Sequence, residues 1–345
     1  MENLSESGRL LYAQLLSQCL HGAAPSGRGF SFVSKRIRGG VHWYLQLTVG
    51  SRKTQHYLGP DTDTVREMIA KEKALWEKAK PDLTTRERLV AMLASGGAHG
   101  VGGAEARVLE LLERVGVFLV GGVLVSSLAF AVYGNMLGVR WDTETTRTED
   151  VDIAGDRHVQ IVLSDKPVRL RDALLKSDMG FIEAPALDRK SPSTKFRIRG
   201  RELSVDLLTP MMDRTSDKPI HLAAFDTYAE PVRFLDYVME DAQPAVIVAK
   251  AGILVNVPSP ARYVIHKLVV SQRRAAAFQV KGAKDVGQAE QLIAVLTRDR
   301  PGDLQLAGHA ASRQPAKFRQ QLQAGIRLLS PESRAQIESV LYKKR

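Results

Sequence analysis

The sequence predicts an α/β (α+β) protein with a small N-terminal sheet-and-helix module, a central core and a C-terminal helical region. Three observations predict this class. Strand-like segments separated by glycine turns occupy residues 29–59, and short apolar strands intermingle with helices over residues 104–257. From Pro258 onward the apolar pattern is helical. A chain of 345 residues has room for two or three domains.

The first 94 residues are expected to form the N-terminal module. Leucines at helical spacing predict a helix over residues 4–20, and three short strands follow over residues 29–59. Further helices are predicted over residues 64–79 and 84–94.

A glycine-rich segment, residues 95–103, is expected to be a linker to a core over residues 104–257. A basic helical domain is expected over residues 258–345. The core is predicted to open with a helix over 104–115, strands over 117–120 and 123–125, and a helix over 128–137.

Three aspartates on two strand-like segments are the candidate reactive centre. In the segment Thr148–Ala154, Asp150 and Asp152 alternate and share one face of an extended strand. Asp206 lies in a second apolar strand, Leu203–Leu208, and would join them if the two strands were adjacent. Divalent cations such as Mg²⁺ relieve the repulsion between such carboxylates. Two metals are the usual device for in-line phosphoryl displacement, so nucleotidyl transfer is our leading hypothesis, and a solvated surface strand is the alternative.

A candidate phosphate-binding turn precedes these acids. The strand over residues 123–125 ends at Ser126-Ser127, and a helix is expected directly afterwards. Free backbone N–H groups and hydroxyls at the start of a helix can bind a phosphate. Gly121-Gly122 is the other candidate, and we favour Ser126-Ser127 because a strand enters it and a helix leaves it.

The order of hydroxyl-bearing turn, helix, Asp-x-Asp strand and later lone aspartate resembles the nucleotidyltransferase-fold superfamily. That superfamily includes DNA polymerase beta, CCA-adding enzymes and toxin-type nucleotidyltransferases, and the chain looks like a prokaryotic branch of it. The resembling segments are Val123–Phe130, Leu137–Trp141, Arg147–Asp152, Val205–Pro210 and Tyr263–Leu268. The family usually has glycine first in the phosphate turn, where this chain has Ser126. The gap from Ser127 to Asp150 is also longer than is usual in the family, which implies an inserted loop around residues 134–146.

The resemblance implies a mixed sheet with flanking helices and two Mg²⁺ ions, replaceable by Mn²⁺, held by the three aspartates. Asp150 and Asp152 would bind metal and the nucleoside triphosphate. Asp206 would hold the second metal and help to deprotonate an acceptor hydroxyl, and Ser126 and Ser127 would bind the β- and γ-phosphates. The implied reaction moves a nucleoside monophosphate from a triphosphate such as ATP to that hydroxyl and releases pyrophosphate.

Basic residues of the C-terminal region are further candidates for nucleotide binding. Tyr263, Lys267 and Arg274 fall at i, i+4 and i+11 and share a helix face. The resemblance implies that Lys267 contacts phosphates, and Arg274 could assist. Lys284 begins the next predicted helix, over residues 284–296, and is a third candidate. A salt-bridged surface helix is the alternative.

The charge distribution favours a polyanionic partner. Lys and Arg outnumber Asp and Glu by 12 to 8 over residues 1–85 and by 16 to 6 over residues 258–345. Residues 86–257 hold 21 basic against 24 acidic residues. A slightly negative centre between basic flanks is typical of an enzyme that acts on RNA or DNA, and a basic solvated surface is the alternative.

The composition also bears on location. No run of about 18 apolar residues predicts a membrane span. Cys19 is the only cysteine, and the N-terminus lacks the pattern of a secretory signal. We therefore expect a cytoplasmic protein. Two rival functions stay open: an inactive nucleotidyltransferase-fold protein that binds nucleic acid, and the toxin of a toxin–antitoxin pair.

Overall fold

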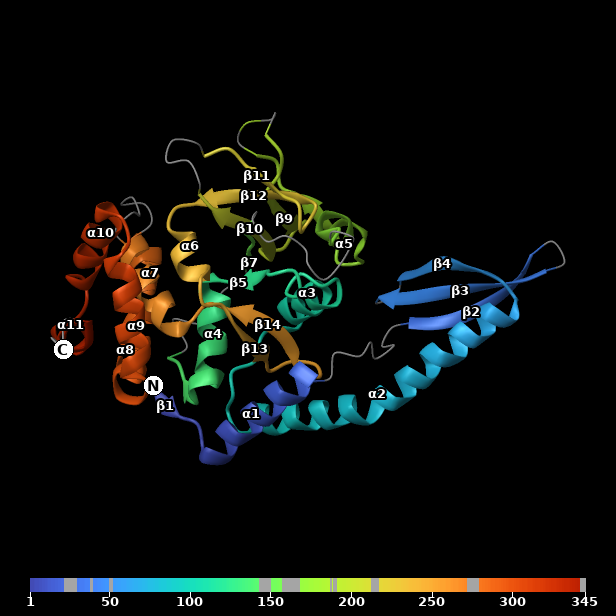
Figure 1. Cartoon of the computed structure of the whole chain (residues 1–345), viewed down its shortest axis with the longest axis horizontal. Helices are drawn as coiled ribbons and strands as arrows, with labels where there is room; N and C mark the ends of the chain where they lie inside the picture. Colours follow the sequence, from blue (N-terminus) through green and yellow to red (C-terminus); the bar gives the residue numbers. More distant parts are fainter. Residues whose placement is uncertain are drawn as a thin grey trace.

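The structure, a computed structural model, describes residues 1–21, 30–37, 40–49, 52–142, 150–156, 168–186, 188, 191–211, 217–271 and 279–341. Its centre is a mixed sheet (Figure 1). The strand order is β11 (Ile220–Leu222), β12 (Thr227–Val232), β10 (Ser204–Pro210), β7 (Asp150–Ala154) and β5 (Val123–Leu124), with β9 (Lys195–Ile198) and β8 (Phe181–Glu183) branching from β10. Strand β10 is parallel to β7 and β12, whereas β5 and β9 are antiparallel to their neighbours. The predicted fold class is confirmed.

Two-residue alternation explains how one sheet carries both a core and a polar face. Val151 of β7 and Val205 of β10 are fully buried. The neighbouring Asp152 and Asp206 point to the opposite face and are only partly covered. The acids therefore line a face that the apolar core does not occupy.

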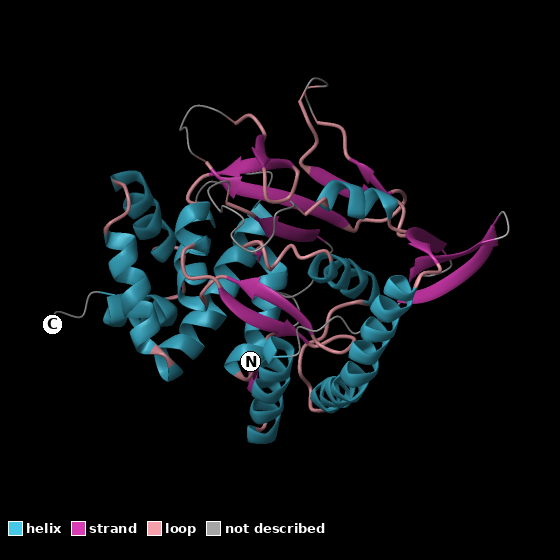
Figure 2. Ribbon diagram, turned by 45° about the vertical axis from the view of Figure 1, so that its right-hand side comes forward, coloured by secondary structure: helices cyan, strands magenta, loops and turns pink. Residues whose placement is uncertain are grey.

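One hydrophobic core joins this sheet to helices from both halves of the chain. Around the sheet lie α3 (Gly103–Arg114), α4 (Ser126–Leu137), α5 (Leu170–Lys176), α6 (Leu235–Met239) and the hairpin of β13 (Gln243–Ile247) and β14 (Ile253–Val257). The predicted C-terminal helices are confirmed as α7 (Pro260–Ser271), α8 (Gln279–Asp299), α9 (Pro301–Ser312), α10 (Ala316–Ile326) and α11 (Pro331–Leu341). They cluster at one end of the molecule (Figures 1 and 2).

Helix α8 begins earlier than the sequence indicated. It starts at Gln279, so Lys284 lies inside the helix and not at its first residue. Gly282 is a poor helix former and weakens the helical signal there, but packing of α8 against α7 extends the helix. Arg274 lies outside the described residues.

The N-terminal module is a three-stranded antiparallel sheet on a long helix (Figure 1). Its elements are α1 (Glu6–His21), β2 (Phe30–Ile37), β3 (Gly40–Val49), β4 (Arg52–Pro60) and α2 (Asp63–Ser95). The ring of Phe32 on β2 stacks on Trp76 of α2, with 4.9 Å between centroids. Near the other end of α2, Leu89 and Leu93 are buried in a cluster shared with α1.

Helix α2 is one continuous helix where the sequence predicted two, over residues 64–79 and 84–94. A proline such as Pro81 normally interrupts a helix, because it lacks an N–H donor and crowds the preceding turn. Contacts at both ends of α2 stabilise the helical path through Pro81. The local signal was therefore overridden by tertiary packing.

The strand predicted over residues 117–120 is wrong, because this segment forms turns. The backbone N–H of Val117 donates to the carbonyl of Leu112, and that of Gly122 donates to the carbonyl of Val117. These local hydrogen bonds use the groups that a strand would pair with a neighbour. Val117 and Val120 are apolar because they fill the core.

The loop predicted over residues 134–146 is also wrong in its first half. Helix α4 continues to Leu137 and ends at Gly138, whose φ of 68° is left-handed. Strand β6 (Val139–Arg140) follows and pairs with β1 (Glu2–Asn3). The apolar residues of this stretch are buried, which a solvated loop would not allow. Residues 143–146 lie outside the described part of the chain.

Residues 96–102 connect α2 to α3 and are held against α4 by two hydrogen bonds. The side-chain amide of Asn135 in α4 donates to the carbonyl of His99 at 2.8 Å, and its oxygen accepts from the His99 N–H at 2.8 Å.

Among the described helices, none is both long and apolar enough to cross a bilayer.

The packing of α10 on α7 depends on a glycine. A Cβ on Gly325 would collide with the backbone carbonyl of Leu268, which cannot move aside as a side chain can. We expect Gly325→Ala to lower the free energy of unfolding by roughly 2–3 kcal/mol in urea denaturation. Gly302→Ala is the matched control, because a Cβ there meets nothing within 4 Å. Equal destabilisation by both substitutions would contradict this packing argument.

Candidate active site

Parallel pairing of β7 with β10 brings the three predicted acids to one face of the sheet. The register sets Asp152 opposite Asp206 and Asp150 opposite Ser204. Adjacent strands lie about 4.8 Å apart, so the paired carboxylates of Asp152 and Asp206 repel each other. The adjacency on which the sequence argument depended is therefore present.

Asp152 has a strongly perturbed carboxyl group. Burial, followed by the negative charges of Asp206 and Asp150, raises its pKa to about 6. A hydrogen bond from Ser126 and the charge of Lys267 act in the opposite direction. Burial also raises the pKa of Asp206. Carboxyl groups with raised pKa values in one cluster are typical of functional sites.

Two residues that the sequence analysis did not single out complete this cluster. The Lys195 ammonium on β9 lies 3.0 Å from Asp206 Oδ2 and 3.9 Å from Asp150 Oδ1. The buried Ser204 hydroxyl can donate to Asp150 Oδ1 at 2.7 Å or to Asp206 Oδ1 at 3.2 Å. Both residues alternate with apolar neighbours on their strands, and this alternation was the only pattern in the sequence that indicated a polar face there. Only the cross-strand register shows that they meet the acids.

The predicted phosphate turn lies beside Asp152. Ser126 begins α4, hydrogen-bonds to Asp152 through its side chain, and accepts a 2.8 Å hydrogen bond from Tyr263 Oη on its carbonyl. Its φ of 62° is in the left-handed region, which costs a non-glycine residue roughly 1–2 kcal/mol. Ser126 thus adopts a backbone conformation that glycine adopts more readily than serine does. Ser126 and Ser127 present the free N–H groups of a helix start.

Lys267 is buried behind this turn. Its ammonium forms a 2.6 Å ion pair with Asp285 and lies 5.1 Å from the centre of the Tyr263 ring. The side chains of Lys267 and Asp285 are only 7% and 5% exposed. The predicted contact of Lys267 with a phosphate stays a prediction, as does that of the half-buried Lys284 on α8.

The three aspartates supply the chemistry that a hard divalent cation needs. Carboxylate oxygens are the preferred ligands of Mg²⁺, and burial together with the neighbouring carboxylates raises the pKa of Asp152. Among the described residues, no three His, Cys, Asp or Glu side chains are spaced to share one ion. The ammonium group of Lys195 contacts the cluster from β9. The donor set fits metal binding by its chemistry.

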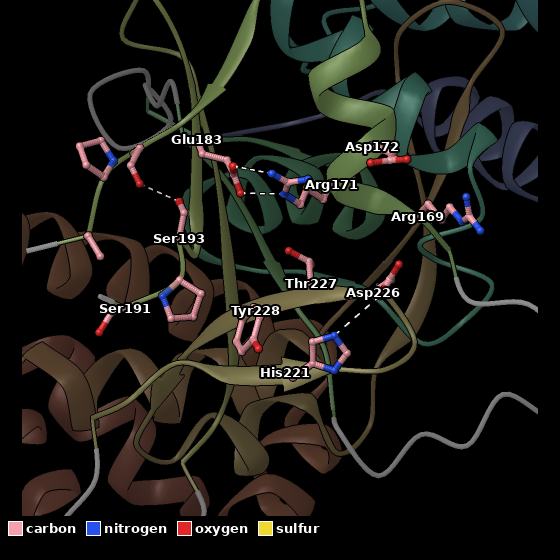
Figure 3. A pocket seen from close by; sticks show the side chains of 14 residues that line it. Arg169, Arg171, Asp172, Glu183, Ser191, Ser193, His221, Asp226, Thr227 and Tyr228 are labelled. Carbon is pink, nitrogen blue, oxygen red and sulfur yellow. Dashed lines mark hydrogen bonds and ion pairs between the residues drawn. The ribbon is translucent and has the colours of Figure 1, made fainter. Parts of the chain in front are cut away.

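The structure also has a cavity of about 790 Å³ (Figure 3). It opens between β8, α5 and the hairpin of β11 and β12. One wall carries Arg171 and Glu183, which form a two-pronged ion pair with distances of 2.9 and 2.8 Å. Another carries His221, whose ring packs against Tyr228 with 5.1 Å between centroids. None of the three aspartates lines it, so this cavity is not the candidate active site.

A comparison with protein families identifies the family of this chain. A family model described as Nucleotidyltransferase matches residues 104–313, more than half of the chain. The chain belongs to this family. The match covers the central sheet, the turn at Ser126 and helices α3 to α9, which confirms the resemblance seen in the sequence. No curated protein and no solved structure gives a significant match.

The stability of this nucleotidyltransferase should depend on the charge of Asp152. Its pKa is about 6 in the folded chain against an ordinary 3.8, so the unfolded chain releases this proton first as pH rises. The contribution of Asp152 to the free energy of unfolding is therefore greatest below pH 3.8 and falls between pH 3.8 and about 6. Above that range the free energy of unfolding is lower by roughly 3 kcal/mol. We expect Asp152→Asn to stabilise the metal-free protein at about pH 8 and to have little effect near pH 4. Urea denaturation in EDTA at both pH values measures this, and a pH-independent effect would contradict it.

The backbone of the turn should tolerate glycine and reject a β-branched residue at position 126. We expect Ser126→Gly to change the free energy of unfolding by less than about 1 kcal/mol, because relief of the left-handed strain offsets the loss of a hydrogen bond. Ser126→Val should destabilise the nucleotidyltransferase by at least about 2 kcal/mol, since its Cβ branch strains this conformation. Denaturation curves of the two variants side by side test this. Equal stability would show that the left-handed φ is not required.

Proposed function

We propose that this nucleotidyltransferase moves a nucleoside monophosphate from a nucleoside triphosphate to an acceptor hydroxyl and releases pyrophosphate. One observation carries the proposal: Asp150, Asp152 and Asp206 share a face, and a helix-opening turn lies directly beside them. In this reaction the acceptor oxygen bonds to the α-phosphorus while the bond to the pyrophosphate oxygen breaks. The acceptor proton passes to a base.

The residues divide this work according to their positions. The N–H groups at the start of α4, with Ser126 and Ser127, bind the β- and γ-phosphates and hold the leaving pyrophosphate. Asp206 orients the acceptor hydroxyl and receives its proton, and Lys195 at 3.0 Å holds Asp206 in place. The Ser204 hydroxyl lies between Asp150 and Asp206 and donates its hydrogen bond to one of them at a time.

Two Mg²⁺ ions are part of the proposal. Asp150, Asp152 and Asp206 would hold them, and the bound ions would neutralise the triphosphate and lower the pKa of the acceptor hydroxyl. Mn²⁺ would replace Mg²⁺, because it accepts the same oxygen ligands. A cytoplasmic location stays a prediction from the sequence.

The deciding experiment follows label from each α-³²P nucleoside triphosphate into total cellular RNA and protein in the presence of Mg²⁺. We expect the wild type to transfer label, and Asp152→Asn to lose at least about a thousandfold in rate because a metal ligand is removed. Asp303→Asn, an exposed carboxylate on α9, is the matched control and should retain full activity. EDTA should abolish transfer by the wild type.

The folded state of the inactive variant is checked by its denaturation curve, since Asp152→Asn is expected to be at least as stable as the wild type. Undiminished transfer by Asp152→Asn would refute the assigned site. Absence of transfer with every triphosphate would favour the inactive nucleic-acid-binding alternative. Growth arrest on expression that requires Asp152 would identify the toxin alternative.

A further inference from the structure

A row of basic side chains continues from the acids along β9. The sequence Lys195-Phe196-Arg197-Ile198-Arg199 alternates basic and apolar residues. Phe196 and Ile198 are buried, whereas Arg197 and Arg199 are exposed. Strand β9 therefore turns an apolar face to the core and a basic face outward.

The register of β9 with β10 places this basic face beside the catalytic acids. Lys195 is the cross-strand partner of Asp206, and Arg197 is the partner of Ser204. Beyond β9, Arg199 and Arg201 lie in the turn that leads into β10. We call Lys195, Arg197, Arg199 and Arg201 the basic hairpin.

The guanidinium groups of three members of the basic hairpin are not neutralised by a described acidic residue. Arg197, Arg199 and Arg201 form no ion pair or side-chain hydrogen bond with any described residue, unlike Arg171, which is held by Glu183. They line a hollow of about 450 Å³, in which Glu202 is the one acidic side chain. Neighbouring guanidinium groups repel one another, and each offers several donors suited to phosphate oxygens. The hollow therefore has the composition of an anion-binding surface.

The strand order indicates whether an anion bound at this surface is part of the nucleoside triphosphate or part of the acceptor. The strands run β5, β7, β10, β9 across the sheet, so the turn at Ser126 and the basic hairpin lie on opposite sides of the acids. The triphosphate is proposed to bind at the turn. The basic hairpin instead borders Asp206, the residue proposed to take the proton of the acceptor. An anion bound there is part of the acceptor.

The length of the row argues for several phosphates in a line. Residues two apart on a strand are separated by roughly 6.6 Å, so Lys195 and Arg197 are about that far apart, and Arg199 in the turn beyond β9 extends the row further. A single phosphate group cannot bridge that length, whereas a polynucleotide backbone presents a charge at every nucleotide. The row begins next to Asp206, where the reacting hydroxyl is expected.

We propose that the acceptor is a polynucleotide whose phosphodiester backbone binds the basic hairpin and whose terminal hydroxyl reaches Asp206. This rests on the proposed function and adds the class of acceptor to it. RNA and DNA share the backbone chemistry, and separate arms of the experiment distinguish them. The surface lies inside the segment of slightly negative net charge, so the basic flanks of the sequence did not indicate it.

The test compares the triple variant Arg197→Gln/Arg199→Gln/Arg201→Gln with a control triple, Arg313→Gln/Lys317→Gln/Arg319→Gln. The control removes the same charge from exposed residues at the end of α9 and on α10. Fluorescence anisotropy measures the binding of fluorescein-labelled single-stranded RNA and DNA of about 20 nucleotides by full-length protein, without triphosphate, at about 50–200 mM salt. Thermal melting verifies that both variants are folded, since all six residues are exposed.

We expect the hairpin variant to bind at least about tenfold more weakly, with a salt slope smaller by about 2, as the loss of three phosphate contacts requires. The control should stay within about threefold of the wild type. The proposal is overturned if the hairpin variant binds like the wild type, if both variants lose affinity equally, or if the wild type binds neither RNA nor DNA.

A second readout separates this proposal from the proposed function. In the transfer reaction, the hairpin variant should raise the KM for the oligonucleotide and leave the KM for the triphosphate unchanged. A raised KM for the triphosphate alone would overturn the assignment of the hairpin to the acceptor. Intact oligonucleotide binding with no transfer by the wild type would count against the proposed function and leave the hairpin as a binding surface.

Discussion

The in-register parallel pairing of β7 with β10 is the constraint on which the rest of the site depends. It sets Asp152 opposite Asp206 and forces like charges together at the edge of a hydrophobic core. This arrangement costs stability, since each carboxylate raises the free energy of ionising its neighbour. The surrounding residues are arranged around this repulsion: Lys195 binds Asp206, and Ser204 and Ser126 hydrogen-bond to the acids.

The site also stores backbone strain. Ser126 is held in a left-handed conformation at the first residue of α4, and Tyr263 donates to its carbonyl from α7. Such strain persists where the surrounding structure over-determines it, which is frequent at functional sites. Tyr263 in turn lies against Lys267 and its buried partner Asp285. The helices that follow the sheet therefore shape the turn, although they are distant from it in sequence.

The features predicted correctly from the sequence depend on local patterns, and those that were missed depend on tertiary packing. The shared face of Asp150 and Asp152 followed from the two-residue period of a strand, and the helix after Ser127 followed from its apolar composition. The segment 117–120 was misassigned because an apolar run looks alike in a strand and in a buried turn. The continuity of α2 through Pro81 was missed because its cause is packing at the two ends of the helix.

The sequence by itself determined which reactive groups this protein carries: three aspartates in apolar strands and a hydroxyl-bearing turn. These are local facts, since alternation and helix starts are encoded within a few residues. The tertiary structure alone decided which of them meet. Strand register placed Lys195 and Ser204 among the acids, and strand order set the basic hairpin on the side opposite the turn at Ser126. Register and order are set by contacts between residues far apart in the chain, which no local pattern contains.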